Sequence, residues 1–368
     1  MTPISKRILS LDVFRGLIIV LMIIVNSQNT LAYPLLLHAD WNGFTLADLV
    51  FPAFLFIVGL TAVISLQRHL GLEKKGNVYK SVIKRSLIMF FLGLLLAVFP
   101  WNIHLETFRF YGILQRIAVC YLLSSLIFLN SSLKTQIGIF LFIIIAYWYL
   151  MTQVAVPLGG VNQLTPAGSW VAYMDQLFFS PNHLLNKTYD PEGFLSTFPA
   201  LATTLLGMFA GHILIGEQEN KLKNFYLLCV LGLIMMLGGY WWNIYFPINK
   251  SLWSSSYVLW SGGISLLIFA ACFLVIDIMD YQRWALPFKI FGMNALFAFI
   301  VHVLFLKAQF KIKFIYKGSE TNLKDIITQF LFNDFSPENA VLLYALSFLL
   351  LNFLIVFFLY KRKIFIRI

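Results

Sequence analysis

The chain has 368 residues, of which 60% are hydrophobic and 12% are charged, and its mean hydropathy is +0.82. Soluble domains carry about 25% charged residues, so the composition excludes a soluble surface and indicates that hydrocarbon surrounds most of this one. The net charge of +11 does not indicate nucleic acid, because the basic residues lie in short segments between apolar stretches. Cys120, Cys229 and Cys272 lie inside apolar runs and match neither a disulfide framework nor a zinc site, so no metal is expected.

Runs of about 18 or more apolar residues predict about ten transmembrane helices. In chain order they lie at 9–30, 45–67, 83–100, 112–130, 134–152, 194–216, 222–246, 255–277, 285–307 and 337–360. The first run has no convincing cleavage site after it, and we expect it to stay as a helix. No soluble domain, low-complexity linker or repeat separates the runs. The sequence therefore predicts an all-α, polytopic integral membrane bundle, with one transmembrane domain over residues 1–368.

Basic residues fix the expected orientation. One set of segments holds 18 of the 27 Lys and Arg residues. It comprises the N-terminus with Arg15, the connections 68–85, 131–134, 217–223 and 278–289, and the C-terminal tail. Because cytoplasmic loops carry the excess of Lys and Arg, both termini are predicted to be cytoplasmic. The longer connections 153–193 and 308–336 then face outward.

Polar side chains at membrane depth are costly and are therefore functional candidates. Asp12 and Arg15, in SLDVFRGL, stand three residues apart on one helical face, and an ion pair explains them. Asn26 ends the run LIIVLMIIVN near the outer surface. It either caps or binds a neighbouring helix, or it donates an amide hydrogen bond to an oxygen that develops negative charge.

A polar cluster follows in LLHADWNGFTLADLVFP, between the first two predicted helices. His38 is a candidate general base, because a carboxylate such as Asp48 could hold its tautomer and stabilise its protonated form. The alternatives are a structural or solvated His38, and an Asp48 that only complements the dipole of its helix. Asp40, Trp41 and Asn42 lie beside them and are candidates for contact with a substrate.

The segment YDPEGF at 189–194 predicts a helix entry, with Asp190 as the cap, Pro191 as the first helical residue and Glu192 as a first-turn acid. A substrate contact is the functional alternative for Glu192. Arg116, in YGILQRIAV, is a lone cation just inside a helix, suited either to an acid or to an anionic ligand.

Two further polar residues, Asn294 and His302, lie in the predicted span GMNALFAFIVH. A packed, hydrogen-bonded His302 competes with a catalytic one. In GMFAG, Gly207 and Gly211 form a GxxxG pair, which predicts a close approach of two helices.

In combination these segments resemble the heparan-α-glucosaminide N-acetyltransferase family and its bacterial relatives. The resemblance runs in order through SLDVFRGL, MIIVN, HADWNGFTLADLVFPAFLFIVG, GILQRIAVCY, YDPEGFLSTFPALATTLLGMFAG, LWSSSYVLWSGG, GMNALFAFIVH and LYKRKIF, nearly the whole chain. It implies a compact bacterial member in the inner (cytoplasmic) membrane that moves an acetyl group from acetyl-CoA to the amine of a glucosamine-type sugar.

The resemblance also implies roles for single residues. It places the family's catalytic His on His38, an active-site Asn on Asn26 after a one-residue difference in the loop, and the acid of ADLVFP on Asp48. His38 would then accept the proton of the sugar amine, Asn26 would stabilise the oxyanion, and Asp48 would orient His38. A route through acetyl-His38 is the competing version.

Substrate contacts follow from the same resemblance and from charge. Cations suited to the CoA phosphates are Arg15, Arg68, Arg85 and Arg116. Residues expected near the acceptor are Asp40, Trp41, Asn42, Glu192, Asn294 and His302.

Two other functions remain open from the sequence. A transporter for an amino sugar or cell-wall fragment would be favoured by helices interrupted within the membrane or by an inverted repeat, and the sequence shows neither clearly. An acyltransferase with another acceptor, such as a polysaccharide or lipid-linked sugar, is the third hypothesis. The expected partners are membrane lipid and, by family resemblance, a second copy in a homodimer.

Overall fold

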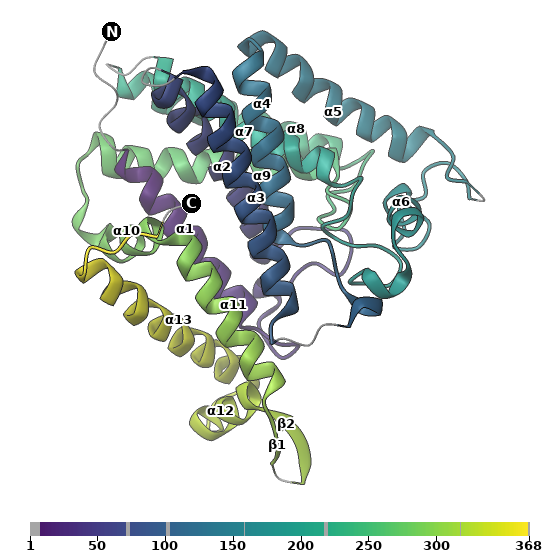
Figure 1. Cartoon of the computed structure of the whole chain (residues 1–368), viewed down its shortest axis with the longest axis vertical. Helices are drawn as coiled ribbons and strands as arrows, with labels where there is room; N and C mark the ends of the chain where they lie inside the picture. The colour runs from purple at the N-terminus through teal and green to yellow at the C-terminus, as the bar shows by residue number, and fades with distance from the viewer. Residues whose placement is uncertain are drawn as a thin grey trace.

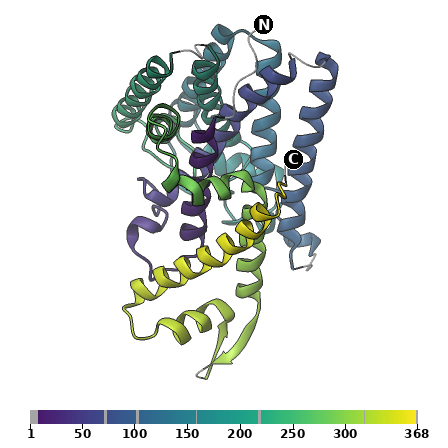
Figure 2. The same cartoon turned by 90° about the vertical axis from the view of Figure 1, so that its left-hand side faces the viewer.

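The computed structural model describes residues 8–70, 74–100, 104–157, 159–216, 220–316 and 318–366 (Figures 1 and 2). In this part of the chain nine helices are long and apolar enough to cross a membrane. They are α1 Leu9–Asn26, α2 Leu46–Leu70, α3 Lys75–Val98, α4 Ile113–Asn130, α5 Leu133–Gln153, α7 Thr197–Gly216, α8 Lys221–Trp242, α9 Ser255–Phe273 with its π-helical end Leu274–Ile278, and α13 Pro337–Lys361. The predicted all-α polytopic membrane fold is therefore confirmed.

The predicted helix at 285–307 is not continuous. It consists of α10 (Leu286–Met293) and α11 (Ala295–Lys311), and the two parts meet at an angle of 72°. The break lies at Asn294, whose ψ of 38° is not helical and whose side chain binds the backbone near the C-terminus. Counted as one span, the pair brings the number of described spans to ten. The prediction of an unbroken helix was wrong because hydropathy reports composition and not backbone direction.

Several boundaries differ from the prediction by a few residues, and two differ by more. Helix α3 begins at Lys75, eight residues before the predicted start, so Lys75 and Lys80 lie on the helix and not in a loop. The expected helix entry at Asp190 was wrong, because α7 begins only at Thr197. The segments expected to be cytoplasmic include Lys6, Arg7 and Arg367, which lie outside the described residues. Lys317, in the connection 308–336 that is expected to face outward, also lies outside them.

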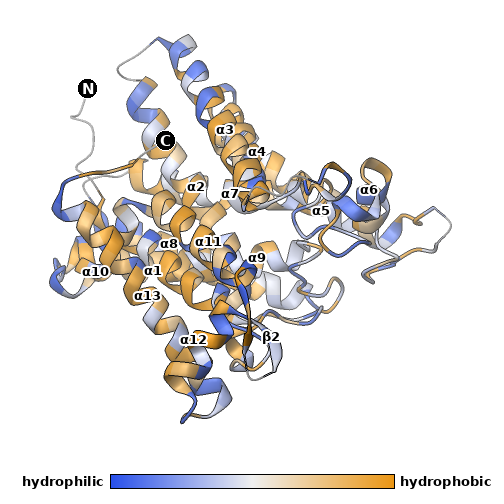
Figure 3. Ribbon diagram, turned by 60° about the horizontal axis from the view of Figure 1, so that its bottom comes forward, coloured by the Kyte–Doolittle hydropathy of each residue, from blue (hydrophilic) through white to orange (hydrophobic). Residues whose placement is uncertain are grey.

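The remaining elements are short. Helices α6 (Trp170–Phe178) and α12 (Leu323–Phe332) lie outside the spans, and 3₁₀ turns occur at Pro34–Leu36, Leu105–Thr107, Pro181–His183 and Arg283–Ala285. Strands β1 (Lys313–Tyr316) and β2 (Ser319–Asn322) form an antiparallel hairpin in which Phe314 faces Thr321. The hairpin and α12 project together at the bottom of Figure 1. Figure 3 shows apolar residues along the long helices and polar residues at their ends and connections.

Helix α2 is central to the packing, and its neighbour α7 lies against it without room for a methyl group. A Cβ on Gly59 would stand 1.8 Å from the carbonyl oxygen of Thr204, and one on Gly207 would stand 1.9 Å from that of Phe56. Gly211 meets Val63 one turn further along. The predicted close approach at GMFAG is therefore confirmed, and α2 is its partner.

Glycines also allow a close backbone contact between α1 and α10. A Cβ on Gly16 would lie 1.8 Å from the carbonyl oxygen of Phe288, and one on Gly292 would lie 1.8 Å from that of Asp12. Without side chains between them, the two backbones are in direct contact. Helix α1, which ends in Asn26, is thus fixed against the short half of the broken helix.

Candidate active site

The segment before α2 folds back onto the first turn of that helix, and Asp48 holds it there. The carboxylate is 1% exposed; its Oδ1 lies 2.8 Å from His38 Nδ1. Its Oδ2 accepts hydrogen bonds from the backbone N–H groups of Ala39 at 3.2 Å and Thr45 at 3.1 Å. Because an ionised carboxylate only accepts, His38 Nδ1 carries the proton, and Nε2 presents its lone pair. The predicted pairing of His38 with Asp48 is present in the structure.

A lysine that was not among the predicted site residues completes this group. Lys250 Nζ lies 3.0 Å from both ring nitrogens of His38 and 3.7 Å from Asp48 Oδ1. An atom equally distant from both nitrogens lies beside the ring and not along the Nε2 lone pair. Burial lowers the pKa of Lys250, and the neighbouring Asp48 and Glu192 partly oppose that shift. The signal in the sequence was a lone cation at the entry to an apolar run, in PINKSLWSS.

Hydrogen bonds between two connections bring Lys250 to His38. Asn249 Nδ2 donates to Asn42 Oδ1 at 3.1 Å, and the N–H of Gly43 donates to the carbonyl of Ile248 at 2.8 Å. Gly43 has a φ of +123°, which strongly favours glycine. Asn42 thus supports the loop in which it lies.

The other members of the predicted cluster, Trp41 and Asp40, have different surroundings. Trp41 lines the cavity described below, donates its indole N–H to the carbonyl of Leu164 at 2.8 Å and packs edge-on against Tyr189. Asp40 is exposed.

Asn26 and His302, which the sequence placed on different helices, are in contact. Asn26 Nδ2 lies 3.1 Å from His302 Nε2, and His302 Nδ1 lies 2.8 Å from the carbonyl of Phe299. Because a carbonyl only accepts, His302 Nδ1 carries the proton, and Nε2 accepts from the Asn26 amide. His302 is fully buried and so fixes the orientation of the amide. One N–H of Asn26 is used by this bond and a second is left for another acceptor.

A charged clamp holds the segment 190–196 near the same end of α2. Arg109 donates to both carboxylate oxygens of Asp190, at 2.7 and 2.6 Å, and also to Glu192. This pairing explains why Asp190 does not cap a helix. The carboxylates raise the pKa of Arg109 against the opposing effect of burial. Arg109 was not predicted, since its partners lie more than 80 residues away.

Beneath this clamp lie two more charged residues. Asp175 is fully buried and accepts from the backbone N–H groups of Asp190 and Phe194 at 2.9 and 3.0 Å. Burial raises the pKa of Asp175 to about 6. Arg116 donates to the carbonyl of Gly193 and lies over the ring of Trp253. The structure therefore places Arg116 under the segment 190–196.

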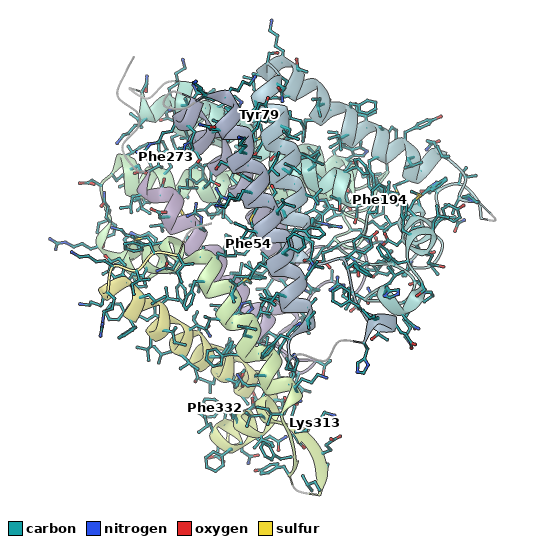
Figure 4. All side chains as sticks on the ribbon, viewed as in Figure 1. Phe54, Tyr79, Phe194, Phe273, Lys313 and Phe332 are labelled. Atoms are coloured by element: carbon teal, nitrogen blue, oxygen red, sulfur yellow. The ribbon has the colours of Figure 1, made fainter. Side chains whose placement is uncertain are left out.

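One cavity of about 1010 Å³ extends from the group of His38, Asp48 and Lys250 to the opposite end of α2. At one end it is lined by Asn26, His38, Trp41, Asp48, Glu192, Lys250 and Ser251. At the other end it is lined by Asp12, Arg15, Arg68, His69 and Arg85. Between them the lining is mostly apolar, and it includes Phe54, labelled near the centre of Figure 4. Asp48 and Arg68 are 20 residues apart on one helix, so the cavity extends for about 30 Å.

At the Arg68 end, one predicted residue lines the cavity and another holds nearby backbone in place. Arg15 lines the cavity, donates to the carbonyl of Gly292 at 3.2 Å and lies 3.5 Å from Asp12, so the predicted ion pair is present. Asn294 is buried; it donates to the carbonyl of Ile364 at 3.1 Å and accepts from the N–H of Ile366 at 2.9 Å. Asn294 lies at the break between α10 and α11 and is not among the residues that line the cavity. Among the described residues no group of His, Cys, Asp or Glu side chains is placed to hold a metal ion.

Fold and site together define a polytopic helical membrane protein in which an Asp-oriented histidine and a basic cluster line one long cavity. Residues 7–246 match the family model described as the catalytic region of heparan-alpha-glucosaminide N-acetyltransferase, and the chain belongs to this family. The mouse heparan-alpha-glucosaminide N-acetyltransferase is 29% identical over 357 aligned residues, covering 81% of this chain and 53% of the mouse protein. The human protein of that name is 27% identical over 363 residues, covering 83% of this chain and 54% of its own. The chain thus spans about half the length of these relatives.

Proposed function

We propose that this chain is a transmembrane N-acetyltransferase that moves the acetyl group of acetyl-CoA to the amine of a glucosamine-type sugar. The family and the names of its relatives support acetyl transfer to an amino sugar. The observation that carries the proposal is the single cavity, which has Arg15, Arg68 and Arg85 at one end and His38 at the other. CoA has phosphates at one end and its thioester at the other, and this polarity matches the lining.

The proposed chemistry uses groups whose partners are already in place. His38 Nε2 accepts the proton that the sugar amine loses as it attacks the thioester carbonyl. Asp48 keeps Nδ1 protonated and stabilises the imidazolium that forms. The second N–H of Asn26 donates to the carbonyl oxygen as that oxygen becomes negative, while His302 holds the amide in place.

Substrate contacts are assigned by position in the cavity. Arg68 and Arg85, with Arg15, take the phosphates of CoA. Glu192 and Trp41 line the His38 end and contact the sugar. In this assignment Arg116 supports the segment 190–196, because it donates to Gly193 there. The phosphate end then faces the cytoplasm, in agreement with the orientation predicted from the basic residues. The inner-membrane location, the cytoplasmic termini and a homodimer stay predictions.

The decisive experiment compares transfer from labelled acetyl-CoA to glucosamine by purified wild-type protein and by His38→Ala in detergent. We expect labelled N-acetylglucosamine with the wild type and a loss of about 10²–10⁴-fold in kcat/KM with His38→Ala, the usual contribution of a general base. His104→Ala removes an exposed histidine outside the cavity and serves as the matched control. Full activity of His38→Ala would refute both the general-base route and the route through acetyl-His38.

The kinetic order needs a second measurement. A route through acetyl-His38 predicts a burst of CoA before any sugar is added and a trapped acetyl group on His38. Direct transfer predicts that CoA appears only when both substrates are present.

A transporter for an amino sugar is the second candidate, and one observation favours it. The break at Asn294 divides a span into two half-helices at 72°, a feature that transporters use at binding sites. Folded protein that binds glucosamine but transfers no acetyl group would support this candidate. Binding of acetyl-CoA alone would instead indicate an acyltransferase with another acceptor.

A further inference from the structure

An amine of the chain itself lies within reach of the position that an acceptor amine must take. A base and the group it deprotonates must come within about 2.6–3.2 Å of each other. Lys250 Nζ lies 3.0 Å from His38 Nε2, and both side chains line the same cavity. In the absence of a sugar, the nearest amine to the base is therefore that of Lys250.

The surroundings of Lys250 increase the fraction of its amine that is neutral and nucleophilic. Its side chain is 22% accessible, and it lines the cavity that would hold the thioester. Burial lowers the pKa of its ammonium group, which increases the neutral fraction at a given pH. The lysine stem is long and flexible, so Nζ can move from the side of the imidazole ring to the Nε2 lone pair.

Two other lysines among the described residues, Lys324 and Lys187, lack this combination. Lys324 is 1% exposed, but its Nζ donates to the carbonyl of Gln28 and lies over the rings of Phe310 and Tyr344. Lys187 is exposed on a connection and is freely accessible to reagents. Among the described residues neither lysine is hydrogen-bonded to a histidine, and neither lines the cavity. They are internal references for burial and for exposure, respectively.

We propose that Lys250 is an acceptor within the chain: when the amino sugar is absent, its amine takes the acetyl group from acetyl-CoA. This inference rests on the proposed function. In the step, Nζ attacks the acetyl carbonyl carbon, a C–N bond forms and the C–S bond to CoA breaks. The proton lost by Nζ passes to His38 Nε2 and then to the CoA thiolate, which leaves as the thiol. The product is a neutral acetyl-lysine beside Asp48.

This modification has a functional consequence. Acetyl-Lys250 has lost the cation that lies 3.7 Å from Asp48, and its acetyl group occupies space at the His38 end of the cavity. The modified protein therefore excludes the sugar. Acetylation of Lys250 would thus stop turnover when the donor is abundant and the acceptor is missing.

The experiment incubates the full-length protein in detergent with labelled acetyl-CoA and no sugar, then measures the acetylated fraction of each lysine by mass spectrometry over time. We expect Lys250 to be acetylated at least about tenfold faster than Lys187, while Lys324 stays unmodified. His38→Ala should slow acetylation of Lys250 by about 100-fold or more and leave Lys187 unchanged. Glucosamine, added in a parallel sample, should protect Lys250 by competition.

Each outcome decides the inference separately from the proposed function, because acetylated sugar is measured in the same preparation. Sugar acetylation with Lys250 no faster than Lys187, or unaffected by His38→Ala, would refute the inference and leave the function standing. Acetylation of Lys250 that depends on His38, without acetylated glucosamine, would support the inference and refute only the choice of acceptor. If neither group is acetylated, both are refuted.

Discussion

The contact between α2 and α7 should tolerate no added methyl group, and Gly207→Ala tests this. The new Cβ would begin 1.9 Å from the carbonyl oxygen of Phe56, whereas contacts under 3.0 Å are essentially never found. The two backbones must therefore separate by about 1 Å in a close-packed interior. Overpacking of this kind costs about 1–3 kcal/mol. Because the obstacle is backbone and not a flexible side chain, we expect the upper half of this range.

Gly138→Ala is the matched control for this prediction. Gly138 lies inside α5, and a Cβ there would meet nothing within 4 Å. The substitution keeps only the gain in helix propensity, about 0.5–1 kcal/mol. The assay is thermal unfolding of both variants and the wild type in one detergent at one scan rate. Gly207→Ala should unfold at lower temperature, by about 2–4 °C per kcal/mol, and Gly138→Ala should not. Equal melting temperatures for the two variants would refute the backbone contact.

Three further predictions concern charged groups. Asp48→Asn should lower kcat/KM by about 10²–10⁴-fold at unchanged expression, since the amide no longer stabilises the protonated ring of His38; activity within about threefold of wild type would contradict this role. The pKa of Asp175 is about 6 in the folded protein against 3.8 ordinarily, so between these two pH values the folded state binds more protons than the unfolded state. The free energy of unfolding should therefore fall by about 3 kcal/mol as the pH rises from about 4 to about 6. Thermal unfolding at several pH values measures this slope, which Asp175→Asn should abolish. Arg85→Met should raise KM for acetyl-CoA by about 10–100-fold with little change in kcat, whereas Lys80→Met, which removes a cation outside the long cavity on the same helix, should change neither.

Hydropathy was sufficient for the architecture, because a span in hydrocarbon has a minimum apolar length whatever its neighbours are. It did not predict the break at Asn294, since the compensating bonds come from Ile364 and Ile366, some 70 residues away. The same limit applies to the helix entry expected at Asp190. Helix capping was sufficient to explain Asp190 before Pro191 from the local sequence, but in the structure Asp190 pairs with Arg109.

The candidate site was predicted in part for the same reason. His38 and Asp48 are separated by a short loop, so their pairing was accessible to reasoning about local sequence. Lys250 reaches them only through contacts between two connections that are over 200 residues apart. The contact of Asn26 with His302 was likewise invisible, although each residue was a candidate alone. Residue type therefore identified members of the site, and tertiary structure was needed to join them.

The geometry of α2 bears on the choice between enzyme and transporter. One face of this helix contacts α7 with no space between the backbones, and the opposite face lines the cavity from Asp48 to Arg68. These two residues are thus held at a separation of about 30 Å, close to the thickness of the hydrocarbon core. A free amino sugar is too small to contact both ends at once, and the arginine cluster would then have no ligand. An elongated donor with phosphates at one end satisfies both ends simultaneously and leaves the His38 end for the acceptor. The length and polarity of the cavity therefore favour a two-substrate transferase, even though a broken helix forms part of its wall.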